Sequence, residues 1–234
     1  MKIGIFGFNN ISCGKENIID QRLGTVKEMA QSAKKAYIQV ELLTDFARLK
    51  ECDGIISLKE KQVDLILTDL EVVERRLTNI QEDKERNLLN RFREQLDKEK
   101  FIFELQLTEE ESRIVSGYSI LSLRPIFLVE AQDLKDKSKA LFSAYNYFGY
   151  ISFFTANDKE ARAWSIKKET TCWQASGLIH SDIQRGFIRA EVIGFKDLMN
   201  DAGINQARAN NHLRLEGKDY IVQDGDLIKF RFNK

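Results

Sequence analysis

Short apolar segments alternate with one amphipathic stretch along the first 63 residues. The segments KIGIFGF, YIQVELLTD and DGIISLK are rich in aliphatic residues, and we expect strands at residues 2–8, 37–45 and 53–59. Between the first two, RLGTVKEMAQSAKKA predicts a short helix over residues 22–36. A strand, a helix and further strands in this order indicate a small α/β layer with some parallel pairing.

From about Val63 the apolar period changes to that of a helix. Apolar residues recur at steps of four and three, which is the seam of a helix packed along a partner: Ile66, Leu70, Val73, Leu77 and Ile80. After the polar run QEDKERN, a second apolar stripe follows: Leu88, Leu89, Phe92 and Leu96. The pattern predicts a turn at this run between two antiparallel helices, a helical hairpin arm over residues 64–113. Most of its charged outer face is expected to be solvated.

The chain then returns to the first layer. Thr108 and Glu111 have the spacing of a capping box that opens another helix. RPIFLVEAQD is again apolar and strand-like, and it contains the only proline of the sequence, Pro125. We expect it to be a further strand of the first layer, so that residues 1–63 and 114–149 form one domain and the arm is inserted into it.

From about Tyr150 the sequence becomes rich in short strands. The segments YISFFTA, ARAWSI, GFIRAEVIGF, KDYIVQ and DLIKFRF are expected to be strands, joined by turn signals such as Asp224-Gly225. One helical stretch, CWQASGLIHSDI, interrupts them. A small mixed sheet with a helix across one face is a β-grasp arrangement, predicted for residues 150–234. The expected fold class is therefore α/β plus α+β.

Composition restricts the possible functions. Of the 234 residues 43% are hydrophobic and 31% are charged, and the charges balance to zero, so any affinity for nucleic acid must come from a local patch. The 3 cysteines lie in no paired motif and the 2 histidines are far apart, which argues against a zinc site and favours a reducing cytoplasm. We expect no signal peptide, no membrane span and a cytoplasmic location.

The segment GFNNISCGKE, residues 7–16, follows the first predicted strand and looks like a phosphate-binding loop. A working loop has four residues between its Gly and its Gly-Lys-Ser/Thr, so that backbone amides wrap the phosphates and a hydroxyl binds magnesium. Here six residues separate Gly7 from Gly14, and Glu16 follows Lys15 where the hydroxyl belongs. The segment after it is too short and irregular for the helix that completes such a site. The segment therefore departs from a working phosphate-binding loop in its spacing, in the magnesium-binding hydroxyl and in the helix that should follow.

The C-terminal half carries a specific resemblance. The segments FFTANDKEARAWSIKKETTCWQASGLIHSDIQRGFIRAEVI and LRLEGKDYIVQDGDLIKFRFN resemble the C-terminal TGS-type domain of the Obg-like ATPases of the YchF type. DLEVVERRL is similar to the opening of that family's helical arm, and LTEEESRIVSGYSILSLRPIFLVE to the segment that returns from it. The resemblance implies a remnant of a P-loop-type α/β layer, an inserted coiled-coil arm and a TGS-like β-grasp domain.

By the same resemblance, the first layer is similar to that family's nucleotide domain after large deletions. ELLTDFARL is similar to the strand that carries a magnesium-linked Asp-x-x-Gly: Asp45 matches the Asp, but Arg48 replaces the Gly. Glu130 stands where the family has the Asn that selects the base. Phosphoryl transfer depends on positioning and charge neutralisation, so these losses together predict no catalysis. Gly7, Gly14, Lys15 and Asp45 are expected to be vestigial, with Lys15 a surface lysine and Asp45 solvated or paired, for example with Arg48.

The resemblance also implies association with ribosomes and RNA. The basic candidates for such contacts are Lys167, Lys168, Arg185 and Arg189. Trp173 and Phe187 could stack on unpaired bases if they are exposed. The alternative interpretations remain open: the aromatic residues belong to the core, and the cations form a solvated face.

Three hypotheses follow. The leading one is a non-catalytic, truncated YchF-like protein, without a cofactor, that binds the ribosome, RNA or a translation-related protein through its arm and TGS-like domain. The second is an ATP- or GTP-binding protein with magnesium and slow hydrolysis, in a rearranged pocket around Gly7, Lys15 and Asp45. The third is a regulatory TGS module that senses a small ligand. A sheet edge left exposed by deletion also makes a homodimer possible.

Overall fold

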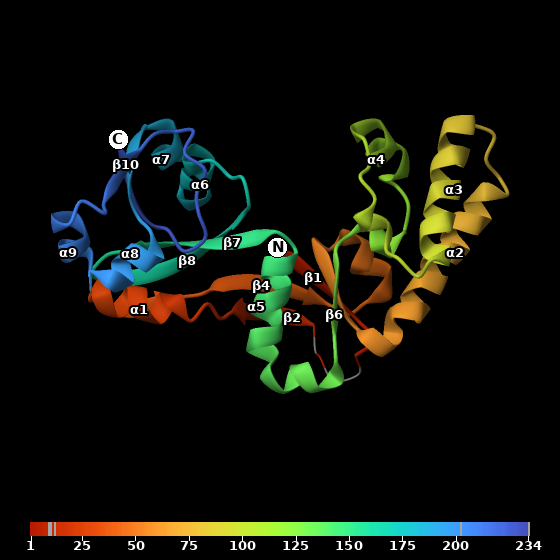
Figure 1. Ribbon diagram of the computed structural model, residues 1–234, viewed down its shortest axis with the longest axis horizontal. Coiled ribbons are helices and arrows are strands. Elements are labelled where there is room, and N and C mark those ends of the chain that lie inside the picture. Colours follow the sequence, from red (N-terminus) through yellow and green to blue (C-terminus); the bar gives the residue numbers. More distant parts are fainter. Residues whose placement is uncertain (9–10, 12, 202, 234) are drawn as a thin grey trace. The chain divides into compact units, whose positions relative to one another are not determined.

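The computed structural model describes residues 1–8, 11, 13–201 and 203–233 (Figure 1). The chain forms two compact units: the first is Met1–Glu16 with Val40–Ala140, and the second is Asn17–Gln39 with Leu141–Lys234. Within the described residues the fold is mixed α/β with two sheets, as expected at that level of detail. The finer division at residues 63, 113 and 149 stays a prediction. No helix of the described part is long and apolar enough to cross a membrane.

The first sheet has the strand order β2-β4-β1-β5-β6. Its strands are β1 (Lys2–Phe6), β2 (Gly14–Ile18), β4 (Ile38–Leu43), β5 (Gly54–Leu58) and β6 (Ile126–Val129). β1 runs parallel to β4 and β5, and β5 runs parallel to β6. The consecutive burial of Ile3, Gly4 and Ile5 in β1 is typical of a parallel strand covered on both faces. The predicted layer and its parallel pairing are confirmed, including the return of β6 after the helices.

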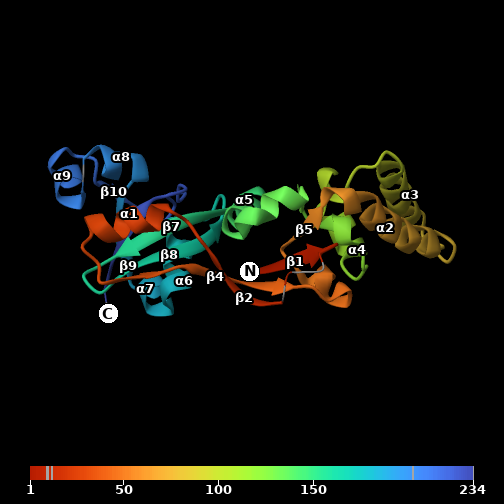
Figure 2. The ribbon, with the colours of Figure 1, turned by 90° about the horizontal axis from the view of Figure 1, so that it is seen from below.

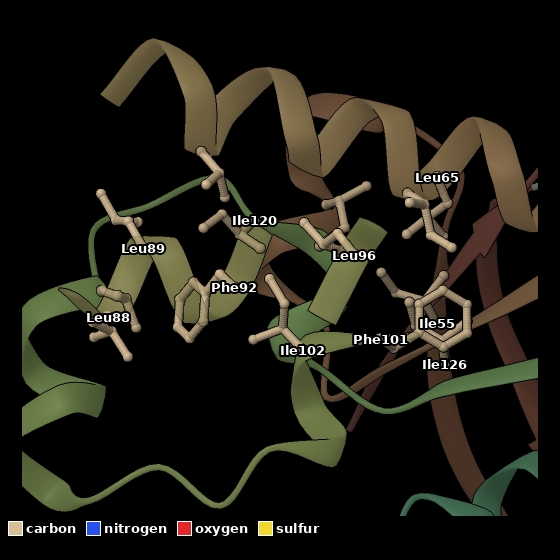
Figure 3. Close-up of a cluster of buried hydrophobic side chains, with 14 of the residues drawn as sticks. Ile55, Leu65, Leu88, Leu89, Phe92, Leu96, Phe101, Ile102, Ile120 and Ile126 are labelled. Atoms are coloured by element: carbon tan, nitrogen blue, oxygen red, sulfur yellow. The ribbon is translucent and has the colours of Figure 1, made fainter. Parts of the chain in front are cut away.

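The predicted helical hairpin is formed by α2 (Gln62–Leu77) and α3 (Asp83–Asp97), which lie side by side (Figures 1 and 2). Both predicted apolar stripes face a shared core, in which Phe92 and Leu96 of α3 gather with Ile102 (Figure 3). The turn is shorter than expected, because α3 already begins at Asp83 inside the polar run. Acidic residues in the first turn of a helix favour such a start.

The next helix after the hairpin opens with the predicted capping box. Thr108 Oγ1 accepts a hydrogen bond from Glu111 N at 3.2 Å, and the Glu111 carboxylate accepts one from Thr108 N at 2.8 Å. Helix α4 (Glu109–Val115) follows directly. Short 3₁₀ turns of this half of the chain lie at Phe46–Glu51, Lys59–Lys61, Ile102–Glu104, Leu121–Leu123 and Ala131–Asp136, and α5 (Lys137–Tyr147) follows the last of them.

The second sheet has the strand order β10-β9-β11-β7-β8-β3. Its strands are β3 (Lys34–Ala36), β7 (Tyr150–Ala156), β8 (Glu160–Lys167), β9 (Phe187–Ile193), β10 (Arg214–Glu216) and β11 (Leu227–Phe232). The sheet is mixed, because β11 is parallel to β7 and β3 is parallel to β8, whereas the other neighbours are antiparallel. Helices α6 (Cys172–Ile179) and α7 (Ser181–Arg185) lie on one face and α1 (Arg22–Met29) lies on the other (Figure 2).

Two predictions for this half of the chain are wrong in detail. KDYIVQ is not a strand: its backbone forms only an isolated bridge, between Ile221 and Thr171. The segment looked like a strand because Val222 is buried and Tyr220 packs against the core, but burial does not require ladder pairing. The strand β10 and the helices α8 (Phe195–Asn200) and α9 (Ile204–Ala209) were not expected.

The predicted helix at residues 22–36 is also shorter and lies elsewhere. α1 ends at Met29, and residues 34–36 form β3, which pairs with β8 of the second sheet. Leu23 and Val26 are buried in the second unit rather than over the first layer. Arg22 contributes to this placement, because it pairs with Asp224 at 2.8 Å in the same unit.

Candidate functional site

The first sheet brings several sequence candidates to one edge. Because β1 and β4 are parallel neighbours, Gly7 and Asp45, which follow them, lie at the same carboxyl edge. Lys59 and Glu130 follow β5 and β6, which are also parallel, and they form an ion pair at 3.2 Å. In open α/β sheets ligands bind at this edge, so it is the place to test for a nucleotide site.

Gly7 lies against the side chain of Lys61. A Cβ placed on Gly7 would be 2.6 Å from Lys61 Cγ and 3.0 Å from Lys61 Cβ, and the backbone φ of Gly7 is +81°. The ammonium group of Lys61 is held by Asp64 at 2.8 Å. In a phosphate loop the glycine gives the phosphate close access to the backbone, whereas here a lysine stem covers the glycine.

Gly14 and Lys15 are the first two residues of a strand. They open β2, so they are not part of a loop that leads into a helix N-terminus. Glu16 follows in the same strand, and its carboxylate accepts a hydrogen bond from Lys137. A carboxylate next to Lys15 offsets the positive charge that a phosphate requires. Residues 9, 10 and 12 of the loop lie outside the described residues.

Asp45 has a local structural role. Its Oδ1 accepts a hydrogen bond from Ala47 N at 3.0 Å, which caps the 3₁₀ turn Phe46–Glu51. Arg48, which was considered as its ion-pair partner, instead lies 3.8 Å from the carboxylates of Glu41 and Glu51. Asp45 is thus used as the cap of this turn.

The four basic candidates of the second unit form two separate pairs. Lys167 is opposite Tyr150, at the beginning of β7. Arg189 is opposite Arg231, near the end of β11, which runs parallel to β7. Lys167 and Lys168 therefore lie toward one end of the sheet, and Arg185 and Arg189 toward the other. The structure does not bring them together as one surface.

Only one of the two aromatic candidates is available to a ligand. Trp173 on α6 is 41% exposed, and its Nε1 donates to the carbonyl oxygen of Gln184 at 3.1 Å. Phe187 is 7% exposed and belongs to the core beneath α6. Nearby, Arg185 donates to Asp182, and this hydrogen bond lowers the pKa of the Asp182 carboxyl. Arg185 is therefore already engaged with an anion.

Cations that were not among the sequence candidates lie beside Arg189. Lys229 and Arg231 are exposed residues of β11, and Arg208 of α9 is 3.6 Å from Glu191 of β9. The signal is in LIKFRF, where the basic residues Lys229 and Arg231 alternate with the apolar residues Ile228, Phe230 and Phe232. That pattern predicts one cationic face.

Comparison with known proteins agrees with this architecture. A family model called YchF-GTPase_C, with the description "Protein of unknown function (DUF933)", matches residues 150–233. The solved structure of the Schizosaccharomyces pombe YchF GTPase superposes with a TM-score of 0.75 at 15% identity, covering 99% of this chain and 97% of that one. This likeness concerns the fold.

Two curated relatives match most of the sequence. The "Ribosome-binding ATPase YchF" of Bacillus subtilis (strain 168) is 30% identical over 246 residues, which cover 77% of this chain and 67% of the relative. The protein of the same name from Mycoplasma genitalium is 32% identical over 232 residues, covering 92% of this chain and 62% of the relative. The chain thus spans about two thirds or less of the length of these relatives. The alignment with the Bacillus subtilis protein is 246 residues long but includes only 77% of this 234-residue chain. It therefore contains gaps in this chain, opposite residues that only the relative has. The chain belongs to the YchF family of Obg-like ATPases.

Proposed function

We propose that this chain is a non-catalytic member of the YchF family that binds the ribosome, RNA or a translation-related protein. In this proposal α2 and α3 are the coiled-coil arm, residues 150–234 are a TGS-like β-grasp domain, and residues 1–63 and 114–149 are a nucleotide-domain remnant. The names of the two relatives, both ribosome-binding ATPases, support the ribosome as the partner.

The observation that carries the loss of turnover is the occupied carboxyl edge of the first sheet. The Lys61 stem lies over Gly7, Lys15 belongs to strand β2, and Asp45 caps a turn. Phosphoryl transfer requires the loop, the metal ligand and the water-orienting segment in fixed relative positions, because the protein supplies positioning and charge. With Gly7, Lys15 and Asp45 in these other roles, a bound triphosphate has no cradle among the described residues.

The support for binding comes from exposed cations of the second unit. Arg189 and its neighbours Lys229 and Arg231 on β11 are all exposed. Contacts from such side chains to phosphates release counterions, so binding is expected to weaken steeply with salt. Because the chain as a whole is neutral, local patches rather than net charge must provide this affinity.

Co-sedimentation with purified ribosomes at low and high salt tests the binding. Retention at low salt that falls as salt rises is the expected result. If the full chain remains in the supernatant at every salt concentration, the ribosome-binding proposal is refuted.

Calorimetry with ATP and with GTP, each with Mg²⁺, tests the loss of the nucleotide site. We expect no heat of binding for the wild type or for Lys15→Ala. Micromolar binding by the wild type that Lys15→Ala abolishes would instead establish the alternative, a nucleotide-binding protein with a rearranged pocket.

A further inference from the structure

One face of the β9–β11 ladder carries a row of cationic side chains. In β11 the exposed Lys229 and Arg231 alternate with Ile228 and Phe230, which pack in the core beneath α6. Side chains alternate between the two faces of a sheet. Lys229 and Arg231 therefore project from the face opposite that core.

Strand register places two residues of β9 beside them. Arg189 is directly opposite Arg231, and Glu191 is directly opposite Lys229. Residues opposite each other in an antiparallel pair share a face, with Cβ atoms about 5 Å apart. Arg208 of α9 reaches the same place, because its guanidinium is 3.6 Å from the Glu191 carboxylate. The four cations Arg189, Arg208, Lys229 and Arg231 are called the β9–β11 basic patch.

The charges within the patch are not balanced. Glu191 is paired with Arg231 at 2.6 Å and with Arg208 at 3.6 Å. Arg189 and Lys229 have no ion-pair partner among the described residues. Like charges directly opposite each other destabilise a sheet, and the carboxylate beside Arg189 and Arg231, Glu191, is shared between Arg231 and Arg208. An anion bound between Arg189 and Arg231 would remove that repulsion.

The backbone around Arg189 is irregular at the same place. Arg231 pairs with Arg189, but the next residue, Phe232, pairs with Phe187, so the ladder has a bulge at Ile188. Ile188 is the extra residue and is 48% exposed. Bulges bend a strand and re-aim its side chains, and this bulge adjoins the unpaired arginine.

We propose that the β9–β11 basic patch binds the phosphate backbone of RNA. This inference rests on the proposed function and assigns its RNA contacts to this surface, rather than to Lys167 and Lys168. Arginine forks bind phosphate oxygens in pairs. Alternate residues along each strand repeat about every 6.6 Å, so the patch offers anion contacts at successive positions, as a polyanion requires.

The test compares two double variants that each remove two positive charges from the full chain. Arg189→Gln/Lys229→Gln changes two patch residues that have no ion-pair partner in the described part of the chain, so no carboxylate there is left unpaired. Lys167→Gln/Lys168→Gln makes the matched change at the other end of the sheet. Affinity for a labelled oligouridylate and for purified ribosomes is measured across a salt series, and thermal unfolding is measured for each protein.

We expect the patch variant to lose affinity by about 25- to 60-fold at 0.1 M salt and its log–log salt slope to fall by about 1.4 to 1.8, as for two lost phosphate contacts. Its melting temperature is expected to equal or exceed that of the wild type, because the Arg189–Arg231 repulsion is relieved. The lysine variant is expected to bind like the wild type.

Other outcomes overturn the inference in distinguishable ways. If the wild type binds and the patch variant binds equally well, the patch assignment fails while the proposed function stands. Equal losses in both double variants also refute the assignment, because charge alone would then explain them. If polyglutamate displaces the oligouridylate as well as unlabelled RNA does, the patch recognises acidic protein and not RNA. If the wild type binds neither RNA nor ribosomes, the proposed function itself fails.

Discussion

Asp69 joins the helical hairpin to the segment that returns to the first sheet. It lies in the middle of α2 and is completely buried, although it is a carboxylate. Its Oδ1 accepts a hydrogen bond from Leu121 N at 2.7 Å, and its Oδ2 accepts one from Ser122 N at 2.7 Å. The two amides begin a 3₁₀ turn at Leu121–Leu123, whose first N–H groups have no partner within the turn.

Replacing Asp69 with alanine would leave both amides buried and unsatisfied. Each such group costs about 1–3 kcal/mol, so we expect the free energy of unfolding of the first unit to fall by about 4 kcal/mol. Asp69→Asn keeps one acceptor oxygen but turns an amide donor toward the other N–H, so we expect an intermediate loss of about 2 kcal/mol. The exposed Glu71 on the same helix supplies the control, because Glu71→Gln removes a charge without removing a buried partner.

Urea unfolding followed by circular dichroism measures these differences. With a slope of about 2 kcal/mol per molar, the alanine variant should unfold about 2 M earlier than the wild type. Glu71→Gln should unfold within about 0.3 M of the wild type. If the alanine variant unfolds within 1 kcal/mol of the wild type, the two hydrogen bonds do not hold the returning segment to α2, and the reasoning is wrong.

Two further predictions concern the second unit. Arg22→Ala should destabilise it by about 3 kcal/mol in urea unfolding, because the buried Asp20 loses its ion pair at 2.7 Å and Asp224 loses its own; unchanged unfolding would contradict the anchoring of α1 by Arg22. The hydrogen bond with Asp201 raises the pKa of His212 above its ordinary value, so the folded state binds this proton more tightly than the unfolded state does. The resulting stabilisation is fully present below the ordinary histidine pKa and is lost as the pH rises through the raised pKa. His212→Gln should therefore flatten the dependence of melting temperature on pH in that window, and an unaltered profile would argue against the pair.

The local pattern of apolar and polar residues predicted where helices and strands form better than it predicted which elements they pack against. The parallel strands of the first sheet and the two stripes of the hairpin follow from burial, which apolar spacing reports directly. The helix containing Leu23 and Val26 was also predicted, but its apolar face carries no information about which sheet it covers. The contacts that hold it, such as the ion pair of Arg22 with Asp224, join residues far apart in sequence and close in the structure.

In the candidate site, too, local features could be predicted from the sequence, whereas contacts between distant residues could not. The failure of the phosphate-loop spacing could be read from Gly7 and Gly14, but the Lys61 side chain over Gly7 depends on how β1 and the chain after β5 come together. Arg189 was identified as a candidate, whereas its neighbours were not, because they come from β11 and α9. Strand register decided which cations share a face, and register is a long-range property.

The two kinds of site also differ in what they need from the backbone. A nucleotide site needs several loops in fixed positions at one sheet edge, so deletions in any of them remove it. A cationic sheet face needs only a ladder whose register is held by its buried side, and here Phe230 and Ala190 supply that side within the core of the second unit. This core is built from residues 151–230, all of them in the second unit. A basic patch on this sheet face therefore does not depend on a phosphate loop at the edge of the first sheet, and RNA binding should be measured independently of nucleotide binding.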